Sequence, residues 1–185
     1  MKPYIYLMAM DSVKVSVPEQ MINELAILFP FDFKIIHNVE YPIYAFEPKR
    51  NQFYANKILA KLCAMIPDDA EKLLGVTEVD LCTPVLSFIF GGAQLDGKVA
   101  IVSAHRLKQK FYNLPDDSEL LLARLAKESV HELGHSFGLI HCCDFNCAMF
   151  FSNNVLSIDV KDKILCKNCK EYFNLKTRKE SYEHG

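Results

Sequence analysis

The sequence lacks the features that would place it in a membrane or on a nucleic acid. No stretch approaches the roughly 18 consecutive apolar residues that indicate a transmembrane helix. No long basic run is present, and 21 basic residues against 23 acidic ones give a net charge of −2. A surface that binds phosphate backbones needs clustered positive charge. We therefore expect neither a membrane nor a nucleic-acid partner.

An export signal is also lacking. The apolar run Tyr4–Met10 ends at Asp11, and no small-residue cleavage site follows it. We therefore expect this run to be a buried first strand and the protein to be cytoplasmic. In a reducing compartment, the seven cysteines favour metal binding over a disulfide framework. Two of them, Cys63 and Cys82, lie in apolar periods and are expected in the core.

Internal repeats and low-complexity segments are absent, so length and composition define the organisation. A chain of 185 residues, half of them hydrophobic, suits one domain with a substantial core. Beyond Gly138, cysteines become frequent and regular hydrophobic periods are few. We predict an α/β part over residues 1–138 and a small irregular part over residues 139–185, with the functional site in the cleft between them.

Hydrophobic periodicity predicts a mixed α/β (α+β) fold. A glycine pair at 91–92 and an Asp-Gly pair at 96–97 mark a hairpin into Val99–Ser103, which would leave an antiparallel edge strand on a mixed, twisted sheet. Asp116, with Glu119 three residues later, resembles a capping box and predicts a helix start near residue 117. We expect strands at residues 4–10, 31–39, 76–82, 85–90 and 99–103, and helices at residues 18–29, 53–66 and 117–138.

The run from His131 to His141 reads H-E-x-x-H-x-x-G-x-x-H, a pattern typical of catalytic zinc sites. Helical residues four apart have Cβ atoms about 5–6 Å from each other, so His131 and His135 can bind one metal ion. Gly138 can adopt a positive φ and turn the chain, which lets His141 supply a third ligand. Three protein ligands leave a fourth position for water. Glu132 is placed to take a proton from that water.

A plainer interpretation treats the two helical histidines as a polar face and Glu132 as a solvated acid. The glycine and the third histidine at fixed offsets argue against it, because they complete the metal geometry. Other polar groups are expected to be solvated. His105 and Arg106, just after Val99–Ser103, could instead steer a substrate or stabilise an oxyanion, and Asp159 could tie down the cysteine-rich segment. The acidic group at residues 68–71 is expected to be a solvated helix end.

Cysteines after the motif indicate a second metal site. Cys166 and Cys169 form a C-x-x-C pair, and Cys142 and Cys147 form a C-x₄-C pair. Two such pairs match a closed Cys₄ zinc site, which would stabilise a segment too poor in apolar residues to fold alone. Cys143 could replace Cys142 as a ligand. A redox role for the C-x-x-C pair is the alternative, but we predict no strand-to-helix context for it.

These motifs resemble the archaemetzincins, a family of metzincin-type zinc peptidases. The resemblance rests on Cys142 directly after His141, on Cys147-Ala148-Met149, and on the C-x-x-C pair; it extends more loosely over residues 85–107. It implies two zinc ions per chain, with Glu132 as general base and acid. Met149 would be the Met-turn methionine packed beneath the catalytic zinc. The resemblance implies His131, His135 and His141 as ligands of that zinc, and Cys142, Cys147, Cys166 and Cys169 as ligands of a structural one.

We therefore expect a zinc-dependent metallopeptidase, an endopeptidase or other peptidase, that acts as a monomer on a peptide or protein tail. The substrate would lie extended along Val99–Ser103 and pair with its free backbone groups. The alternative is a catalytically weak or inactive, zinc-stabilised module that binds peptides or proteins. Phe150 and Phe151, rather than a tyrosine, directly follow Met149, so the extra tyrosine ligand of some metzincins is absent.

Overall fold

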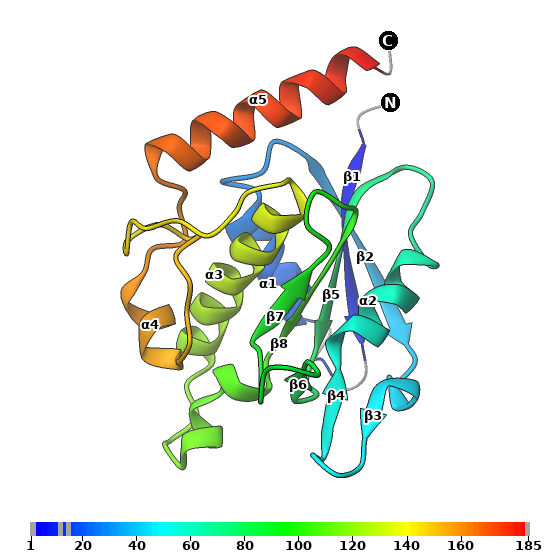
Figure 1. The fold of residues 1–185 in the computed structure, drawn as a ribbon, viewed down its shortest axis with the longest axis vertical. Coiled ribbons are helices and arrows are strands. Elements are labelled where there is room, and N and C mark those ends of the chain that lie inside the picture. The colour runs from blue at the N-terminus through cyan, green and yellow to red at the C-terminus, as the bar shows by residue number, and fades with distance from the viewer. Residues whose placement is uncertain (1–2, 11–12, 14–15, 184–185) are drawn as a thin grey trace.

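A five-stranded mixed sheet forms the centre of the structure, a computed structural model that describes residues 3–10, 13 and 16–183 (Figure 1). Its three inner pairings are parallel, and the last strand in the order is antiparallel to its neighbour. This confirms the predicted mixed sheet with an antiparallel edge. In spatial order the strands are β2 (Asp32–Val39), β1 (Tyr4–Met10), β5 (Ala70–Thr77), β8 (Val99–Ser103) and β7 (Gly91–Ala93).

The antiparallel edge strand is β7, at the opposite edge from β2, and the expectation that Val99–Ser103 forms the edge is wrong. β8 pairs with β5 on one side and with β7 on the other, so its backbone groups are used within the sheet. Residues 85–90 do not form the predicted strand; Ile89 makes only an isolated bridge to Leu81. The guanidinium of Arg50 donates to the carbonyl of Leu86, so a side chain takes the place of a neighbouring strand there.

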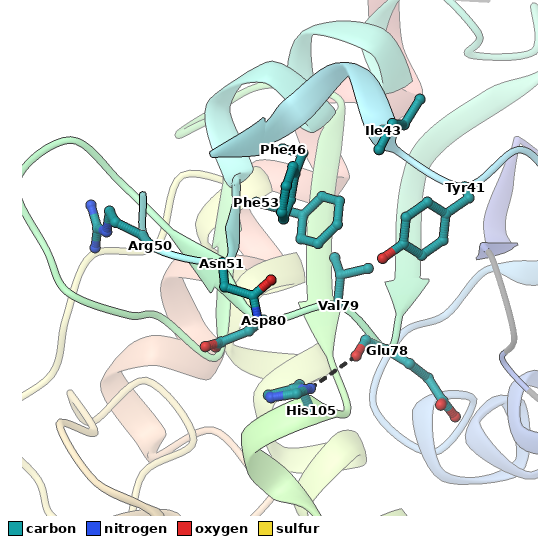
Figure 2. Close-up of a pocket in the computed structure, with 10 residues that line it drawn as sticks. All are labelled: Tyr41, Ile43, Phe46, Arg50, Asn51, Phe53, Glu78, Val79, Asp80 and His105. Atoms are coloured by element: carbon teal, nitrogen blue, oxygen red, sulfur yellow. Dashed lines mark hydrogen bonds between the residues drawn. The ribbon is translucent and has the colours of Figure 1, made fainter. Parts of the chain in front are cut away.

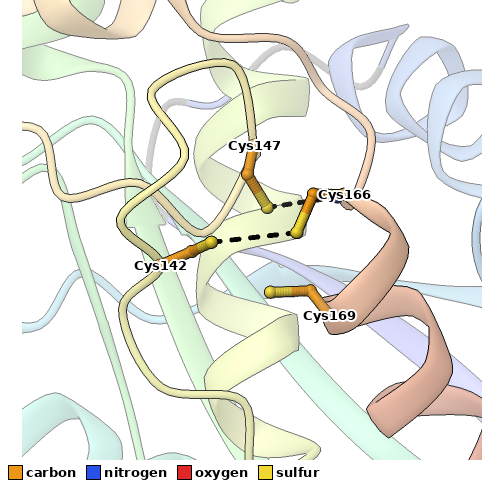
Figure 3. A group of neighbouring side chains, drawn as sticks. All are labelled: Cys142, Cys147, Cys166 and Cys169. Atoms are coloured by element: carbon orange, nitrogen blue, oxygen red, sulfur yellow. Dashed lines mark hydrogen bonds between the residues drawn. The ribbon is translucent and has the colours of Figure 1, made fainter.

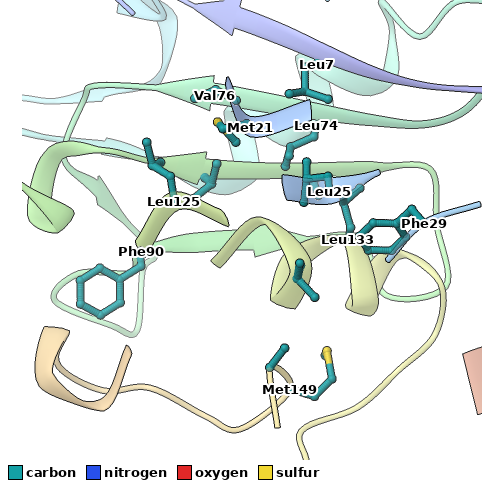
Figure 4. Close-up of a cluster of buried hydrophobic side chains, with 14 of the residues drawn as sticks. Leu7, Met21, Leu25, Phe29, Leu74, Val76, Phe90, Leu125, Leu133 and Met149 are labelled. Atoms are coloured by element: carbon teal, nitrogen blue, oxygen red, sulfur yellow. The ribbon is translucent and has the colours of Figure 1, made fainter. Parts of the chain in front are cut away.

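Helices cover both faces of the sheet. α1 (Ser16–Leu25) and α3 (Ser118–Ser136) pack on one face, and α2 (Ala55–Cys63) packs on the other (Figure 1). Because side chains alternate along a strand, Leu74 and Val76 of β5 point to α1 and α3, and Leu73 points to α2. Figure 4 shows the first of these two apolar layers.

Two helices differ in their bounds from the prediction. Phe53 was expected in the second helix, but its N–H donates to the carbonyl of Asp80 and it lies in a strand, so α2 begins at Ala55. α1 ends at Leu25 rather than before Pro30. A small second sheet and three 3₁₀ turns complete this half: β3 (Phe46–Glu47), β4 (Gln52–Tyr54), β6 (Leu81–Cys82), and the turns Ile43–Ala45, His105–Leu107 and Gln109–Tyr112.

Helix α3, which carries the histidine motif, begins where the sequence predicts. Asp117 is its N-cap, and the carboxylate accepts a hydrogen bond of 2.9 Å from the N–H of Leu120. The cap is therefore Asp117, one residue after the Asp116 of the predicted box. No helix in the described part of the chain is both long and apolar enough to cross a bilayer.

The part beyond residue 138 is more regular than expected, since it contains α4 (Val155–Val160) and α5 (Lys167–Glu183). Asp159 ties the C-terminal segment to α3 instead of being a solvated acid. Both of its carboxylate oxygens accept hydrogen bonds from Arg124 of α3, each at 2.7 Å. α5 is attached through Phe173, whose ring packs edge-on against Phe29 and Phe137 at centroid distances of 5.5 and 5.0 Å. The C-terminal segment is thus fastened to α3 and to the main core.

We expect Phe173→Ala to destabilise the protein by about 3–5 kcal/mol, because it empties a buried aromatic site. Leu175→Ala, on an exposed face of the same helix, is the matched control and should change stability by less than about 0.5 kcal/mol. Urea unfolding measures both. Equal effects would show that α5 does not dock through Phe173.

Candidate active site

Three histidines meet where α3 ends. His131 and His135 lie one helical turn apart on α3, and His141 returns to them after the turn at Gly138. One nitrogen from each ring lies within 4.8 Å of the others. Gly138 has a φ of 86°, the left-handed conformation that the sequence predicted for it. The structure therefore brings together all three predicted histidines.

Backbone carbonyls determine which ring nitrogens face inward. Nδ1 of His131 lies 2.8 Å from the carbonyl oxygen of Ala148, and Nδ1 of His135 lies 2.8 Å from that of Leu139. A carbonyl only accepts, so each Nδ1 carries the proton and each Nε2 keeps its lone pair. The two Nε2 atoms lie 3.1 Å apart. Two lone pairs cannot bond each other at that distance, whereas a metal ion satisfies both.

Burial keeps these rings neutral. It is the main reason that the pKa of each histidine lies below its ordinary value, and that of His131 lies well below it. The nearby charge of Lys161 lowers all three pKa values further. Neutral imidazole is the form that binds zinc. The donor set therefore fits a zinc ion.

Glu132 lies beneath the edge strand. A Cβ atom placed on Gly91 of β7 would be 2.6 Å from its Cγ and 2.7 Å from its Oε1, so the carboxyl packs directly against bare backbone. Burial raises the pKa of Glu132 well above its ordinary value, and the nearby carboxyl of Glu128 raises it further. A carboxyl with a raised pKa is suited to exchange protons near neutral pH. No pattern in the sequence indicates that Gly91 forms this wall.

Met149 packs under the histidine-bearing turn of α3. It is fully buried, and a Cβ atom on Gly134 would come within 2.4 Å of its Sδ. Its carbonyl accepts a hydrogen bond of 2.9 Å from the N–H of Cys142. The methionine thus supports the helix by packing, as expected for a Met-turn, and Gly134 gives it the room to do so.

Four cysteines form a second cluster (Figure 3). Their sulfur atoms all lie within 4.8 Å of one another, and those of Cys142 and Cys166 are 3.8 Å apart. Cys143 is exposed and lies outside the cluster, which favours Cys142 as the ligand. The four members are those that the spacing predicts: Cys142, Cys147, Cys166 and Cys169.

Two expectations about the cysteines need correction. Cys63 is exposed at the end of α2 rather than in the core, because the apolar face of the helix passes through Leu62 instead. Cys82 is buried as predicted. Cys169 lies in the first turn of α5. The C-x-x-C pair therefore does open a helix, but its thiols face two further cysteines rather than a redox partner alone.

His105 and Arg106 are half-buried and hydrogen-bonded within the protein rather than free in solvent. Arg106 makes two hydrogen bonds, of 2.7 and 2.8 Å, to the carboxylate of Asp80, and Nδ1 of His105 lies 3.2 Å from the carbonyl of Glu78. His105 lines a separate cavity of about 540 Å³ at the carboxyl ends of β5 and β8 (Figure 2). Arg50 and Asp80 on its wall are held by internal hydrogen bonds, and none of the clustered histidines or cysteines lines it. Its chemistry is therefore separate from that of the histidine cluster.

The acidic group near residue 69 also makes hydrogen bonds within the protein, although it was expected to be solvated. Asp69 accepts hydrogen bonds of 2.7 Å from both Tyr6 and Lys34. These contacts lower the pKa of Asp69, the Lys34 contact being the larger cause. They tie the start of β5 to β1 and β2, away from the histidines.

Solved structures of known proteins share this architecture. An archaemetzincin from Methanopyrus kandleri aligns with a TM-score of 0.84 and 32% identity, and the alignment covers 96% of each chain. A zinc-dependent peptidase from Methanocorpusculum labreanum aligns with a TM-score of 0.85 and 34% identity over 92% of this chain and 100% of that one. Together with the donor set, this fold defines a zinc metallopeptidase.

Sequence comparison gives the family. The model of Peptidase family M54 matches residues 9–175. The archaemetzincin of Methanocaldococcus jannaschii is 43% identical over 136 residues, 74% of each chain, and that of Pyrococcus horikoshii is 45% identical over 127 residues, 68% of each chain. The chain belongs to peptidase family M54, the archaemetzincins. The resemblance seen in the motifs is confirmed.

Gly91→Ala should displace the Glu132 side chain and also push β7 away from β8, because the new Cβ would lie 2.6 Å from the Glu132 Cγ and 2.7 Å from the Ile101 carbonyl oxygen. We expect a lower peptidase rate, since a misplacement of about 1 Å can cost ~10²-fold. Gly92→Ala is the control, since a Cβ atom there makes only ordinary contacts, at 3.5 and 3.8 Å. Both variants should keep their metal content. Peptide-cleavage rates measure the difference, and equal rates would show that the wall at Gly91 is not needed.

Proposed function

We propose that the protein is an endopeptidase that uses one zinc ion held by His131, His135 and His141, with Glu132 as the general base and acid. The observation that carries the proposal is the pair of inward-facing Nε2 atoms, 3.1 Å apart, each fixed by a carbonyl on the opposite ring nitrogen. This is how metal-binding histidines are oriented in proteins. Buried Glu132, the residue after His131, supplies the proton-transfer group.

A bound zinc ion supplies Lewis acidity, which lowers the pKa of water and polarises a peptide carbonyl. Glu132 accepts a proton from the attacking water as the carbon–oxygen bond forms. It then gives that proton to the amide nitrogen as the carbon–nitrogen bond breaks, so the carboxyl returns to its starting form. The wall at Gly91 excludes water from one side of this carboxyl and keeps its pKa raised.

The substrate is proposed to lie along β7. This strand pairs with β8 on one side only, and Glu132 packs against its first residue. Its residues are two glycines and one alanine, so an extended peptide can approach the backbone closely and pair with it. β7 replaces the Val99–Ser103 strand that the sequence suggested. A peptide or protein tail bound by a monomer of the protein is the simplest substrate for such a strand.

A second zinc ion, held by Cys142, Cys147, Cys166 and Cys169, completes the proposal. Backbone N–H groups of Asp144 and Cys166 donate to the sulfur atoms of Cys142 and Cys147, at 3.4 and 3.3 Å. The bond from Cys166 lowers the pKa of Cys147, although burial is the larger cause and raises it, and a bound metal ion deprotonates a coordinating thiol. Four thiolates close the coordination shell, so this ion would be structural.

Glu132→Gln should lower peptide hydrolysis by ~10²–10⁴-fold, because the proton acceptor is lost while the shape of the side chain is kept. Zinc content should stay at two per chain. Internally quenched peptides blocked at both ends report endopeptidase activity, and peptides with a free end report exopeptidase activity. Cleavage of the unblocked peptides alone would contradict the endopeptidase proposal. An unmodified protein that binds zinc yet cleaves none of them would contradict the peptidase mechanism and favour a binding module.

Cys166→Ser should remove the structural zinc and lower the unfolding temperature. Cys143→Ser is the matched control, because that thiol is exposed, next to a proposed ligand, and outside the cluster. It should keep two zinc ions. Elemental analysis of purified protein measures both, and equal zinc loss from the two variants would contradict the assignment of Cys142 over Cys143.

A further inference from the structure

An ion pair is buried in the core beside the histidines. The side chain of Lys161, directly after α4, has no exposed surface, and that of Glu128 on α3 is 5% exposed; their charged atoms are 2.8 Å apart. Burying two charges is expensive, and replacing such a pair with apolar residues is often neutral or stabilising. Stability alone therefore gives little reason to keep it. Its position suggests another role.

Both partners of this pair lead to the histidine cluster. Glu128 lies one helical turn before Glu132 on the same helix. Nζ of Lys161 also donates, at 3.3 Å, to the carbonyl of Phe150, the residue after Met149. Two residues before Phe150, the carbonyl of Ala148 accepts the Nδ1 proton of His131. A chain of contacts thus leaves α3 at residue 128 and returns to it at residue 131.

These contacts place Lys161 where it can position the segment 148–150. The segment 148–150 must hold the Ala148 carbonyl in line with His131, and the bond from Lys161 to Phe150 holds the other end of that segment. We propose that Lys161, with Glu128 as its counter-ion, is a positioning residue that fixes the orientation of the His131 ring through residues 148–150. The inference rests on the proposed function, in which His131 binds zinc.

Neighbouring contacts provide an internal comparison. Arg124 pairs with Asp159, and Lys127 donates to the carbonyls of Ile158 and Asp159. These bonds also join α3 to α4, but none of them reaches residues 148–150. They join the two helices. Of these three cationic side chains, Lys161 is the one that also donates a hydrogen bond to the segment 148–150. If Lys161 and Glu128 only joined the two helices, their replacement would lower stability without changing the His131 ring, as we expect for Arg124 and Asp159.

The test replaces both charges with unbranched apolar side chains, Glu128→Met with Lys161→Met, so that neither charge is left unpaired. The Nδ1 protons of His131 and His135 are followed by NMR in zinc-loaded protein with ¹⁵N-labelled histidine. We expect the His131 signal to shift and exchange faster with water, whereas the His135 signal, which depends on Leu139, stays unchanged. Zinc binding at the histidines, measured by chelator competition, should weaken about 10–100-fold.

Asp159→Asn is the matched control for helix attachment. It should lower the unfolding temperature while leaving the His131 signal and zinc affinity at their original values. If the double variant does not fold, Glu128→Gln carries the test, since it keeps the volume but weakens the hold on Lys161. There we expect zinc affinity to fall by about threefold or more, with the same selective change at His131. An unchanged His131 signal and unchanged zinc affinity in the folded variant would overturn the inference.

The NMR measurement, which does not depend on peptide cleavage, separates this inference from the proposed function. If the unmodified protein binds zinc but cleaves no peptide, the enzymatic proposal fails while the effect of Lys161 on His131 can still be seen. If the His131 signal is unchanged in the variants while the unmodified protein is an active zinc peptidase, the positioning role of Lys161 is contradicted and the proposed function stands.

Discussion

Two backbone carbonyls, those of Ala148 and Leu139, decide what the histidine cluster can do. By accepting the Nδ1 protons of His131 and His135, they leave two Nε2 lone pairs facing each other at 3.1 Å. That arrangement is unfavourable unless a cation lies between them. The rest of the local structure holds the two carbonyls in place, since Gly138 turns the chain so that Leu139 comes back under the helix. Burial then keeps the rings neutral and ready to bind.

Much of the fold could be predicted because its elements follow simple hydrophobic periods. The first strand, Tyr4–Met10, and the start of α3 near residue 117 agree with the structure. The strand expected at residues 85–90 does not form, because two distant side chains, Arg50 and Gln52, donate to the carbonyls of Leu86 and Ser87. A short edge strand of two glycines and an alanine has no apolar period to detect. Tertiary contacts decided both cases.

Site residues were predictable wherever chemistry fixes their spacing. Helical geometry sets His131 and His135 four apart, and thiolate coordination sets the cysteine pairs. The residues around these ligands have no fixed spacing in the sequence. Gly91 contacts Glu132 from another strand, and Lys161 reaches Glu128 across α4, so neither has a fixed sequence distance from the motif. Glu128 alone had a local signal, since it lies four residues before Glu132.

The histidine cluster and the cysteine cluster share one stretch of backbone. His141 and Cys142 are consecutive, and the N–H of Cys142 donates to the carbonyl of Met149, the residue that packs beneath α3. The peptide that presents the third histidine therefore also begins the cysteine cluster and braces the Met-turn. Movement at Cys142 must pass to His141 through one peptide bond, which is planar and stiff. The zinc ion proposed at the cysteines would for this reason influence the geometry of the one proposed at the histidines, although their ligands are different residues.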